Sequence, residues 1–181
     1  MESKFIRRLF SYFNKLFMIP VFRLGLGSLI GNPFTGYMVI LKTVGNKTGK
    51  TRYTPVNYTI WNSSVYCLAG GGKVAHWYRN LTANPAVDLL LPRGAVAAEA
   101  SEVKDREEKI QAVRQILKKG GFAGFFLGFN PYRAQDEQIY SVVEEMPVIR
   151  FQPTGLASGP ADGGGWFWVP VWGFLIWLIL S

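Results

Sequence analysis

Between residues 37 and 151 the chain alternates short β-forming runs with turn residues, and this pattern constrains the fold more than any other feature. Two pairs of runs are separated only by short turns, Asn62-Ser63 and Pro92-Arg93-Gly94, which is typical of antiparallel hairpins. The predicted strands are Met38–Thr43, Thr54–Trp61, Ser64–Leu68, Val87–Leu91, Ala95–Val103 and Pro147–Phe151. Strands joined mainly by hairpins predict an α+β protein, mainly antiparallel β, folded as a barrel or a sandwich rather than as a doubly wound sheet.

Three helices are predicted between these strands and are expected at the periphery. The first runs through Trp77 and stops at Asn84-Pro85, and the third covers about Ala134–Val143. The second, Asp105–Lys119, begins with an acidic residue and ends with two lysines, which suits the helix macrodipole. Gly120-Gly121 then ends it.

An amphipathic segment precedes this region, at residues 4–24. Its apolar face consists of Phe5, Leu9, Phe13, Leu16 and Phe17, and its polar face of Lys4, Arg7, Arg8, Ser11, Asn14 and Lys15. Such a helix either packs on the domain or lies on an anionic membrane, and the sequence leaves both open.

The segment after the last strand changes character twice. Residues 152–165 are rich in Gly and Pro and predict a linker, and Trp166–Leu180 contains no polar side chain. As a helix, the latter reaches about 22 Å against a hydrocarbon core of about 30 Å, so we expect a membrane anchor that dips into the bilayer or barely forms a transmembrane helix. The predicted parts of the chain are therefore 1–33, 34–151, 152–165 and 166–181.

The charge balance limits the partners. The formal net charge is +8, which favours phosphates or acidic lipid, and the chain has no motif typical of nucleic-acid binding. The single cysteine, Cys67, excludes an internal disulfide, offers no metal cluster and lies in an apolar run that predicts a buried thiol.

A loop between the first two strands, Gly45–Thr51, resembles a nucleotide-triphosphatase phosphate loop but lacks its spacing. The motif needs four residues between its glycines and must open into a helix, whereas three stand here and a strand follows. The loop still brings Lys47, Lys50 and Arg52 together with Thr48 and Gly49, so it can bind a phosphate dianion, although lysines and threonines are also common at solvated hairpin tips.

A second cluster follows the third strand. Gly70-Gly71-Gly72 lets a flat ligand approach the backbone, and the helix beginning near His76 adds two aromatic residues and a cation. Together with the cationic loop, this cluster predicts a site for an aromatic ring with a phosphate tail.

Two blocks, Leu41–Tyr58 and Trp77–Val87, with the closing strand Met146–Phe151, resemble the deazaflavin-dependent nitroreductase and quinone reductase family over about residues 24–153. The resemblance implies a split β-barrel of the flavin-reductase type, FMN-binding-like, which binds coenzyme F420. By position, it places the phosphate and acidic tail at Lys47, Thr48 and Arg52, the ribityl path at Tyr53–Asn57, the ring along Leu68–Gly71 and a cap at His76–Asn80. In full, the predicted cofactor-binding residues are Lys47, Thr48, Gly49, Lys50, Arg52, Tyr53, Thr54, Pro55, Val56, Asn57, Leu68, Ala69, Gly70, Gly71, His76, Trp77, Tyr78, Arg79 and Asn80.

One position departs from the family pattern. Asn46 stands where the family usually has Arg, so one cation is absent, and Lys50 and Lys73 are the candidates to replace it.

The resemblance further implies an F420-dependent oxidoreductase that transfers a hydride to a quinone-like or nitroaromatic acceptor, with no catalytic metal. Tyr132 is the first candidate proton donor and Tyr140 the second. The alternatives are a barrel that binds FMN or haem, and a non-catalytic membrane-associated cofactor-binding module. Lipid contact through the two flanking segments predicts a place at the cytoplasmic face of the cell membrane, and the oligomeric state stays open.

Overall fold

The computed structural model describes residues 12–31, 36–92, 94–120, 130, 132–157 and 168–181. Its strands are β1 (Met38–Val44), β2 (Thr51–Trp61), β3 (Ser64–Leu68), β4 (Ala86–Leu91), β5 (Gly94–Glu102) and β6 (Val148–Leu156). Its helices are η1 (Asn14–Met18), α2 (Ile19–Arg23), α3 (Gly27–Ile30), η2 (Gly72–Val74), α4 (His76–Ala83), α5 (Arg106–Lys119), α6 (Asp136–Val143) and α7 (Trp168–Leu180).

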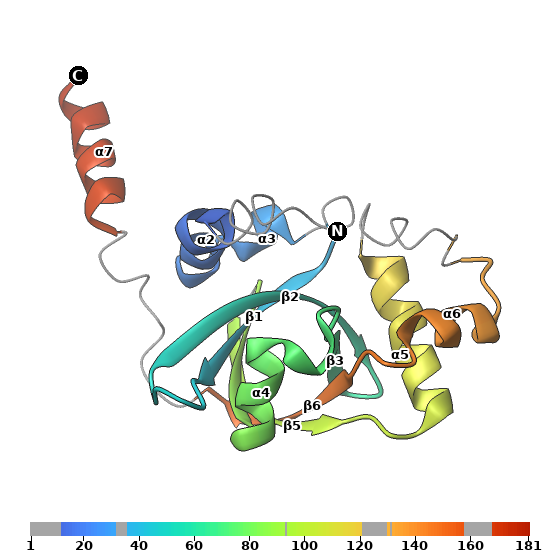
Figure 1. The fold of residues 1–181 in the computed structure, drawn as a ribbon. Coiled ribbons are helices and arrows are strands. Elements are labelled where there is room, and N and C mark those ends of the chain that lie inside the picture. The colour runs from blue at the N-terminus through green and yellow to red at the C-terminus, as the bar shows by residue number, and fades with distance from the viewer. Residues whose placement is uncertain (1–11, 32–35, 93, 121–129, 131, 158–167) are drawn as a thin grey trace.

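The strands form a closed antiparallel barrel in the order β1-β2-β3-β6-β5-β4 (Figure 1). Its interior is filled by alternate residues of each strand, because successive side chains of a strand point to opposite faces. Leu41, Leu89 and Phe151 are fully buried there, and Trp77 and Leu81 of α4 join the same cluster. The fold is therefore the predicted split β-barrel, with α4 packed onto its core.

Helices cover two patches of the barrel's outer surface. On one side, Val113 and Ile116 of α5 and Ile139 of α6 pack with Tyr66 and Val148. On another, Met18 and Phe22 pack on Ile40 of β1 and Leu90 of β4. Figure 1 shows α2 and α3 on one side of the barrel and α5 and α6 on the other.

Two strands extend by several residues beyond their predicted bounds. β2 begins at Thr51, because residues Thr51–Arg52 pair with Thr43 and Val44 across the hairpin. β6 continues to Leu156, so the prediction that a linker begins at residue 152 is wrong: residues 152–156 belong to the strand. Gln152 pairs with Glu99 of β5, and the pairing continues past a bulge at Ala97/Ala98. Gly and Pro in that segment suggested a linker, but residues of a strand beside a bulge tolerate both.

The N-terminal helix packs by a different face from the apolar one predicted. Met18 and Phe22 face the barrel, whereas Phe13, Leu16 and Phe17 are 50%, 63% and 47% exposed. The predicted residues Phe5 and Leu9 lie outside the described residues.

Within the described residues, the structure contains no helix of sufficient length and apolar character to cross a membrane. The predicted transmembrane helix is therefore not supported: α7 has 13 residues, about 20 Å of helix.

Candidate cofactor site

The hairpin loop between β1 and β2 is fixed by its own backbone. The N–H of Gly45 donates to the carbonyl of Lys50 at 2.9 Å, and the N–H of Gly49 donates to the carbonyl of Gly45 at 2.8 Å. Gly49 has a φ of +63°, and a Cβ on Gly45 would lie 2.9 Å from the Thr48 hydroxyl. Both glycines are thus required by the turn itself.

The three predicted cations on this loop are exposed. Lys47, Lys50 and Arg52 lie at the hairpin, and none of them takes part in an ion pair found among the described residues. A guanidinium nitrogen of Arg52 donates to the Thr48 hydroxyl at 3.4 Å, as does the backbone N–H of Lys50. The loop therefore presents positive charge to solvent around one hydroxyl, which suits an anionic group.

Asn80 connects this loop to α4. Its side-chain oxygen accepts a hydrogen bond from the N–H of Asn46 at 3.0 Å, and its side-chain nitrogen donates to the hydroxyl of Thr43 at 3.2 Å. Asn80 and Thr43 are both buried. The structure thus brings the two sequence blocks together, and it uses Asn80 to hold the loop rather than to present a free amide.

The glycines after β3 leave open space in front of the backbone. A Cβ on Gly70 would have no atom within 4 Å, and one on Gly71 would meet only the Cβ of Ala75, at 3.6 Å. Gly70 also lacks a positive φ, so neither the local conformation nor packing explains a glycine there. Bare backbone after β3, together with the exposed cationic loop before β2, fits a ligand with a flat ring and a phosphate tail.

The residues of α4 that were predicted to cap the ring lie in three different environments. Trp77 is buried in the barrel core, whereas His76 and Arg79 are exposed. Tyr78 lies on another side, where its hydroxyl donates to a carboxylate oxygen of Glu102 at 2.7 Å. This hydrogen bond, with a smaller contribution from burial, raises the pKa of Tyr78.

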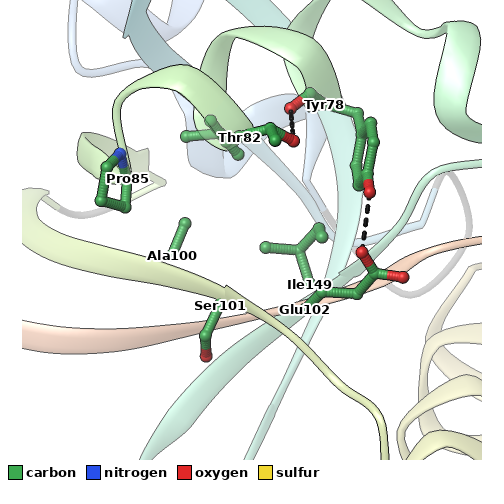
Figure 2. Close-up of a pocket in the computed structure, with 8 residues that line it drawn as sticks. Tyr78, Thr82, Pro85, Ala100, Ser101, Glu102 and Ile149 are labelled. Carbon is green, nitrogen blue, oxygen red and sulfur yellow. Dashed lines mark hydrogen bonds between the residues drawn. The ribbon is translucent and has the colours of Figure 1, made fainter.

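A cavity of about 230 Å³ lies beside Tyr78, and Figure 2 shows the residues that line it. It lies between α4 and β5, with Ile149 of β6 at its floor and the Tyr78–Glu102 pair at one end. Among the predicted site residues, Tyr78 alone lines it in the part of the chain that the structure describes. The cavity is thus separate from the loop that carries the cations.

The predicted ribityl path on β2 alternates between the two faces of the barrel. Val56 packs against the core, and Thr54 shares its face by alternation. Tyr53 packs against the N-terminal helices, with the Arg23 guanidinium 5.2 Å above its ring. The outward residues Tyr53, Pro55 and Asn57 therefore form the stripe that leads away from the cationic loop.

The end of α5 joins this stripe to Tyr132. The carbonyl of Lys119 accepts a hydrogen bond from the N–H of Tyr37 at 3.0 Å, and the carbonyl of Tyr37 accepts one from the Asn57 side chain at 3.5 Å. One residue earlier, the carbonyl of Lys118 accepts from the Tyr132 hydroxyl at 3.2 Å. Asn57 and Tyr132 thus flank the same helix end, and Tyr132 is 60% exposed.

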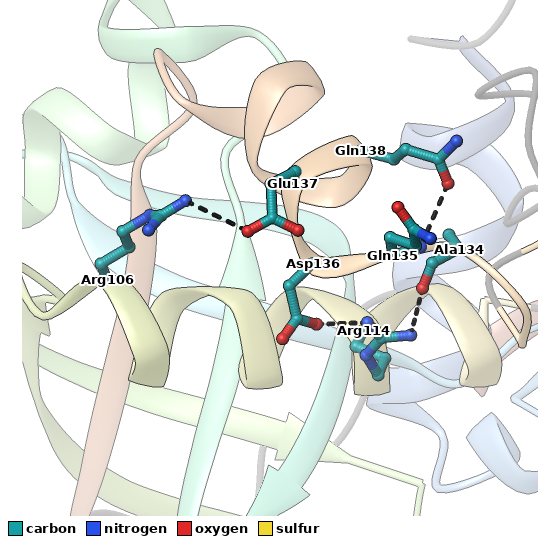
Figure 3. Close-up of polar contacts among 7 residues, drawn as sticks. All are labelled: Arg106, Arg114, Ala134, Gln135, Asp136, Glu137 and Gln138. Carbon is teal, nitrogen blue, oxygen red and sulfur yellow. Dashed lines mark hydrogen bonds and ion pairs between the residues drawn. The ribbon is translucent and has the colours of Figure 1, made fainter.

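Arg114 holds the segment that follows Tyr132, through the contacts with Ala134 and Asp136 that Figure 3 shows. Its guanidinium donates to the carbonyl of Ala134 at 2.8 Å and also to the carboxylate of Asp136. The side chain of Arg114 is only 16% exposed, so these bonds lie partly out of water.

Tyr140 lies elsewhere. Its ring stacks under the guanidinium of Arg106 at 4.7 Å and near the ammonium of Lys109 at 5.8 Å. Arg106 and Lys118 stand twelve residues apart on α5, about 18 Å of helix. The two candidate tyrosines are therefore not brought together, and only Tyr132 is near the end of α5 that meets β2.

Three supporting residues, Thr43, Glu102 and Arg114, were missed by the sequence interpretation. Thr43 offered a signal, since a polar side chain in an apolar strand requires a buried partner. Glu102 and Arg114 offered none, because charged residues at a strand end and within an amphipathic helix are ordinary.

Comparison with known proteins identifies the family and the fold. Residues 21–121 match the family described as F420H(2)-dependent quinone reductase. The chain is also similar to the solved structure of a candidate 5-nitroimidazole antibiotic resistance protein from Bacteroides thetaiotaomicron, with a TM-score of 0.50 and 13% identity, over 66% of this chain and 74% of that one.

Two further structures are similar at lower TM-scores. One is an F420-H2 dependent reductase, with a TM-score of 0.42 and 23% identity, over 63% of this chain and 92% of that one. The other is a haem storage protein from Vibrio cholerae, with a TM-score of 0.45 and 19% identity, over 75% of this chain and 87% of that one.

Proposed function

The chain belongs to the F420H(2)-dependent quinone reductase family and is an F420-dependent oxidoreductase, and we propose that it reduces a quinone-type acceptor by hydride transfer along the outer face of β2. Coenzyme F420 is its cofactor. A nitroaromatic compound is the second acceptor class that the same chemistry permits, because it also accepts a hydride and a proton.

The observation that carries the proposed site is the open backbone at Gly70 and Gly71 in a chain whose cationic loop is held in place by Asn80. When bound, the coenzyme supplies the hydride. Lys47, Lys50 and Arg52 bind its phosphate and acidic tail, and Gly70 and Gly71 let its ring lie against the backbone. Asn46 supplies no cation, and its backbone N–H contributes to the site by donating to Asn80, which anchors the loop.

The acceptor lies beside the end of α5, between Asn57 and Tyr132. Conversion of a quinone to a hydroquinone consumes one proton in addition to the hydride, and Tyr132 donates it. Its O–H group donates to the carbonyl of Lys118 at 3.2 Å, so the acceptor oxygen has to replace that carbonyl as the hydrogen-bond partner of the phenol before the proton moves.

The proposed cofactor site is tested by titrating the protein with reduced and oxidised F420, with FMN as the competing phosphate-bearing ligand. Each loss of a charge-assisted contact costs about 1.5–3 kcal/mol, so Lys47→Ala and Arg52→Ala should each weaken F420 binding by about 10- to 100-fold. Lys104→Ala removes an exposed lysine in the connection between β5 and α5 and serves as the matched control. Unchanged F420 affinity in both loop variants, or tighter binding of FMN than of F420, contradicts the proposal.

A further inference from the structure

We propose that the outward face of the N-terminal helices, together with α7, is a docking surface for a bilayer that contains anionic lipid. The N-terminal part of this surface consists of Tyr12, Phe13, Leu16, Phe17, Leu26 and Leu29, all exposed. We call it the apolar platform.

The side chains of the apolar platform are not those that pack against the barrel. The helix running from Asn14 to Arg23 contacts the barrel through Met18 and Phe22, which are 2% and 5% exposed. Phe13 and Phe17 lie on its other side with their rings 5.2 Å apart. Large apolar side chains gathered on one helix face outside the core mark an interaction site.

α7 adds a second apolar surface. It carries no charged residue, and Trp172, Phe174 and Leu175–Leu180 are all exposed. None of its residues belongs to the hydrophobic clusters formed by the described residues. Figure 1 shows α7 projecting away from the barrel, on the side where α2 lies. Its tryptophans suit the boundary between lipid headgroups and acyl chains, where a short apolar helix can insert without spanning.

The distribution of charge selects anionic lipid as the occupant. Within residues 12–31, which carry the platform, the charged residues are Lys15 and Arg23, and both are basic. Nine of the twelve acidic residues fall between residues 99 and 145, which include α5 and α6, and Figure 1 shows these two helices on the other side of the barrel from the platform. A second copy of the chain would bring two basic surfaces together and be repelled, whereas an anionic bilayer attracts them and buries the apolar side chains.

The platform also borders the proposed active site. Arg23 of α2 lies over Tyr53, and Tyr53 belongs to the outward stripe of β2. Docking through this face therefore places the Tyr53 part of the proposed cofactor path near the lipid surface. This last step rests on the proposed function, but the docking surface itself does not.

The test is co-sedimentation of the full chain, with F420 bound, with vesicles of phosphatidylcholine alone and of equal parts phosphatidylcholine and phosphatidylglycerol. We expect binding to the mixed vesicles, weakened by salt. Leu16→Asp with Phe17→Asp should reduce it by at least about tenfold, because each side chain loses its burial in lipid. Lys15→Glu should reduce it on the mixed vesicles. The matched controls are Ile60→Asp, at an exposed apolar position on β2, and Lys104→Glu.

Other outcomes overturn the inference. Absence of wild-type sedimentation with the mixed vesicles does so, as does equal binding by the Leu16→Asp/Phe17→Asp variant. If sedimentation velocity shows a dimer that this variant dissociates, and vesicles are not bound, the occupant is a second copy. F420 titration of each variant in solution tests the docking surface and the cofactor site separately. A protein that binds vesicles but not F420 would support the docking surface and contradict the proposed cofactor site.

Discussion

The backbone N–H of Asn46 donates a hydrogen bond to the side-chain oxygen of Asn80 at 3.0 Å, across 34 positions of the sequence. The bond joins the β1–β2 loop to α4, and the other end of the same amide reaches Thr43 of β1. A buried side chain of 9% exposure therefore sets where the cations of the loop lie.

Replacing Asn80 with Ala should weaken both folding and cofactor binding. The change leaves the Asn46 N–H and the Thr43 hydroxyl without this partner, so the free energy of unfolding should fall by about 1–3 kcal/mol in urea denaturation. F420 affinity should fall as well, since the loop is no longer held. Asn84→Ala, which removes an exposed bond to the N–H of Ala86, is the control and should change affinity little. Loss of stability with unchanged F420 affinity would restrict Asn80 to a purely structural role.

A substitution at Gly70 should affect ligand binding without affecting folding. Since a Cβ there meets no protein atom within 4 Å, Gly70→Ala should leave the free energy of unfolding unchanged or raise it by up to about 1 kcal/mol. It should nevertheless weaken F420 binding, because the methyl group occupies the space proposed for the ring. Gly36→Ala is the opposite case: at a φ of +91° its Cβ would lie 2.7 Å from the Gly120 carbonyl, so it should destabilise the fold. Undiminished F420 affinity in Gly70→Ala would place the ring elsewhere.

The sequence was sufficient for the barrel but not for the arrangement of side chains around it. Alternation and turn residues predicted the Ser64–Leu68 strand with both ends correct, because local β propensity and the Asn62-Ser63 turn agree there. Cys67 is buried, as predicted, and its pKa is raised by burial. The extension of β6 to Leu156 could not be predicted, since it depends on pairing with β5, a contact that Gly and Pro in the sequence do not indicate.

The candidate site was predictable as two blocks but not as a geometry. The sequence grouped Trp77 and Asn80 with the ligand cap, whereas the structure buries Trp77 in the core and uses Asn80 to hold the loop. Helix periodicity alone cannot distinguish a residue that faces the barrel from one that faces a ligand, because both kinds of residue recur at the same 3.6-residue spacing. For a similar reason the sequence left open which face of the N-terminal helix contacts the barrel, since Phe13 and Phe17 are as apolar as Met18 and Phe22.

Arg114 should affect catalysis through Tyr132. Arg114→Met removes the bonds to Ala134 and Asp136 while keeping the aliphatic bulk, so the Tyr132 segment should lose its fixed position. We expect a lower kcat for quinone reduction with little change in F420 affinity, similar in direction to Tyr132→Phe. Arg114→Lys should restore part of the activity. Equal loss in kcat and in F420 affinity would indicate general disruption of α5 instead.

Tyr78 should make part of the fold's stability depend on alkaline pH. Its pKa is raised above 10.0, first by the hydrogen bond to Glu102 and then by burial, so the folded state favours the protonated phenol. The contribution to stability is therefore complete below the unfolded pKa of 10.0 and is lost as pH rises through the higher folded pKa. Thermal unfolding of wild type and Tyr78→Phe across this range should show a difference in melting temperature that becomes smaller at high pH.

Burial also raises the pKa values of Tyr58 and Tyr66, so the pH dependence of the wild-type protein alone is not diagnostic. The quantity to measure is therefore the difference between the two proteins. A constant difference at all pH values would show that the Tyr78–Glu102 bond does not hold α4 against β5.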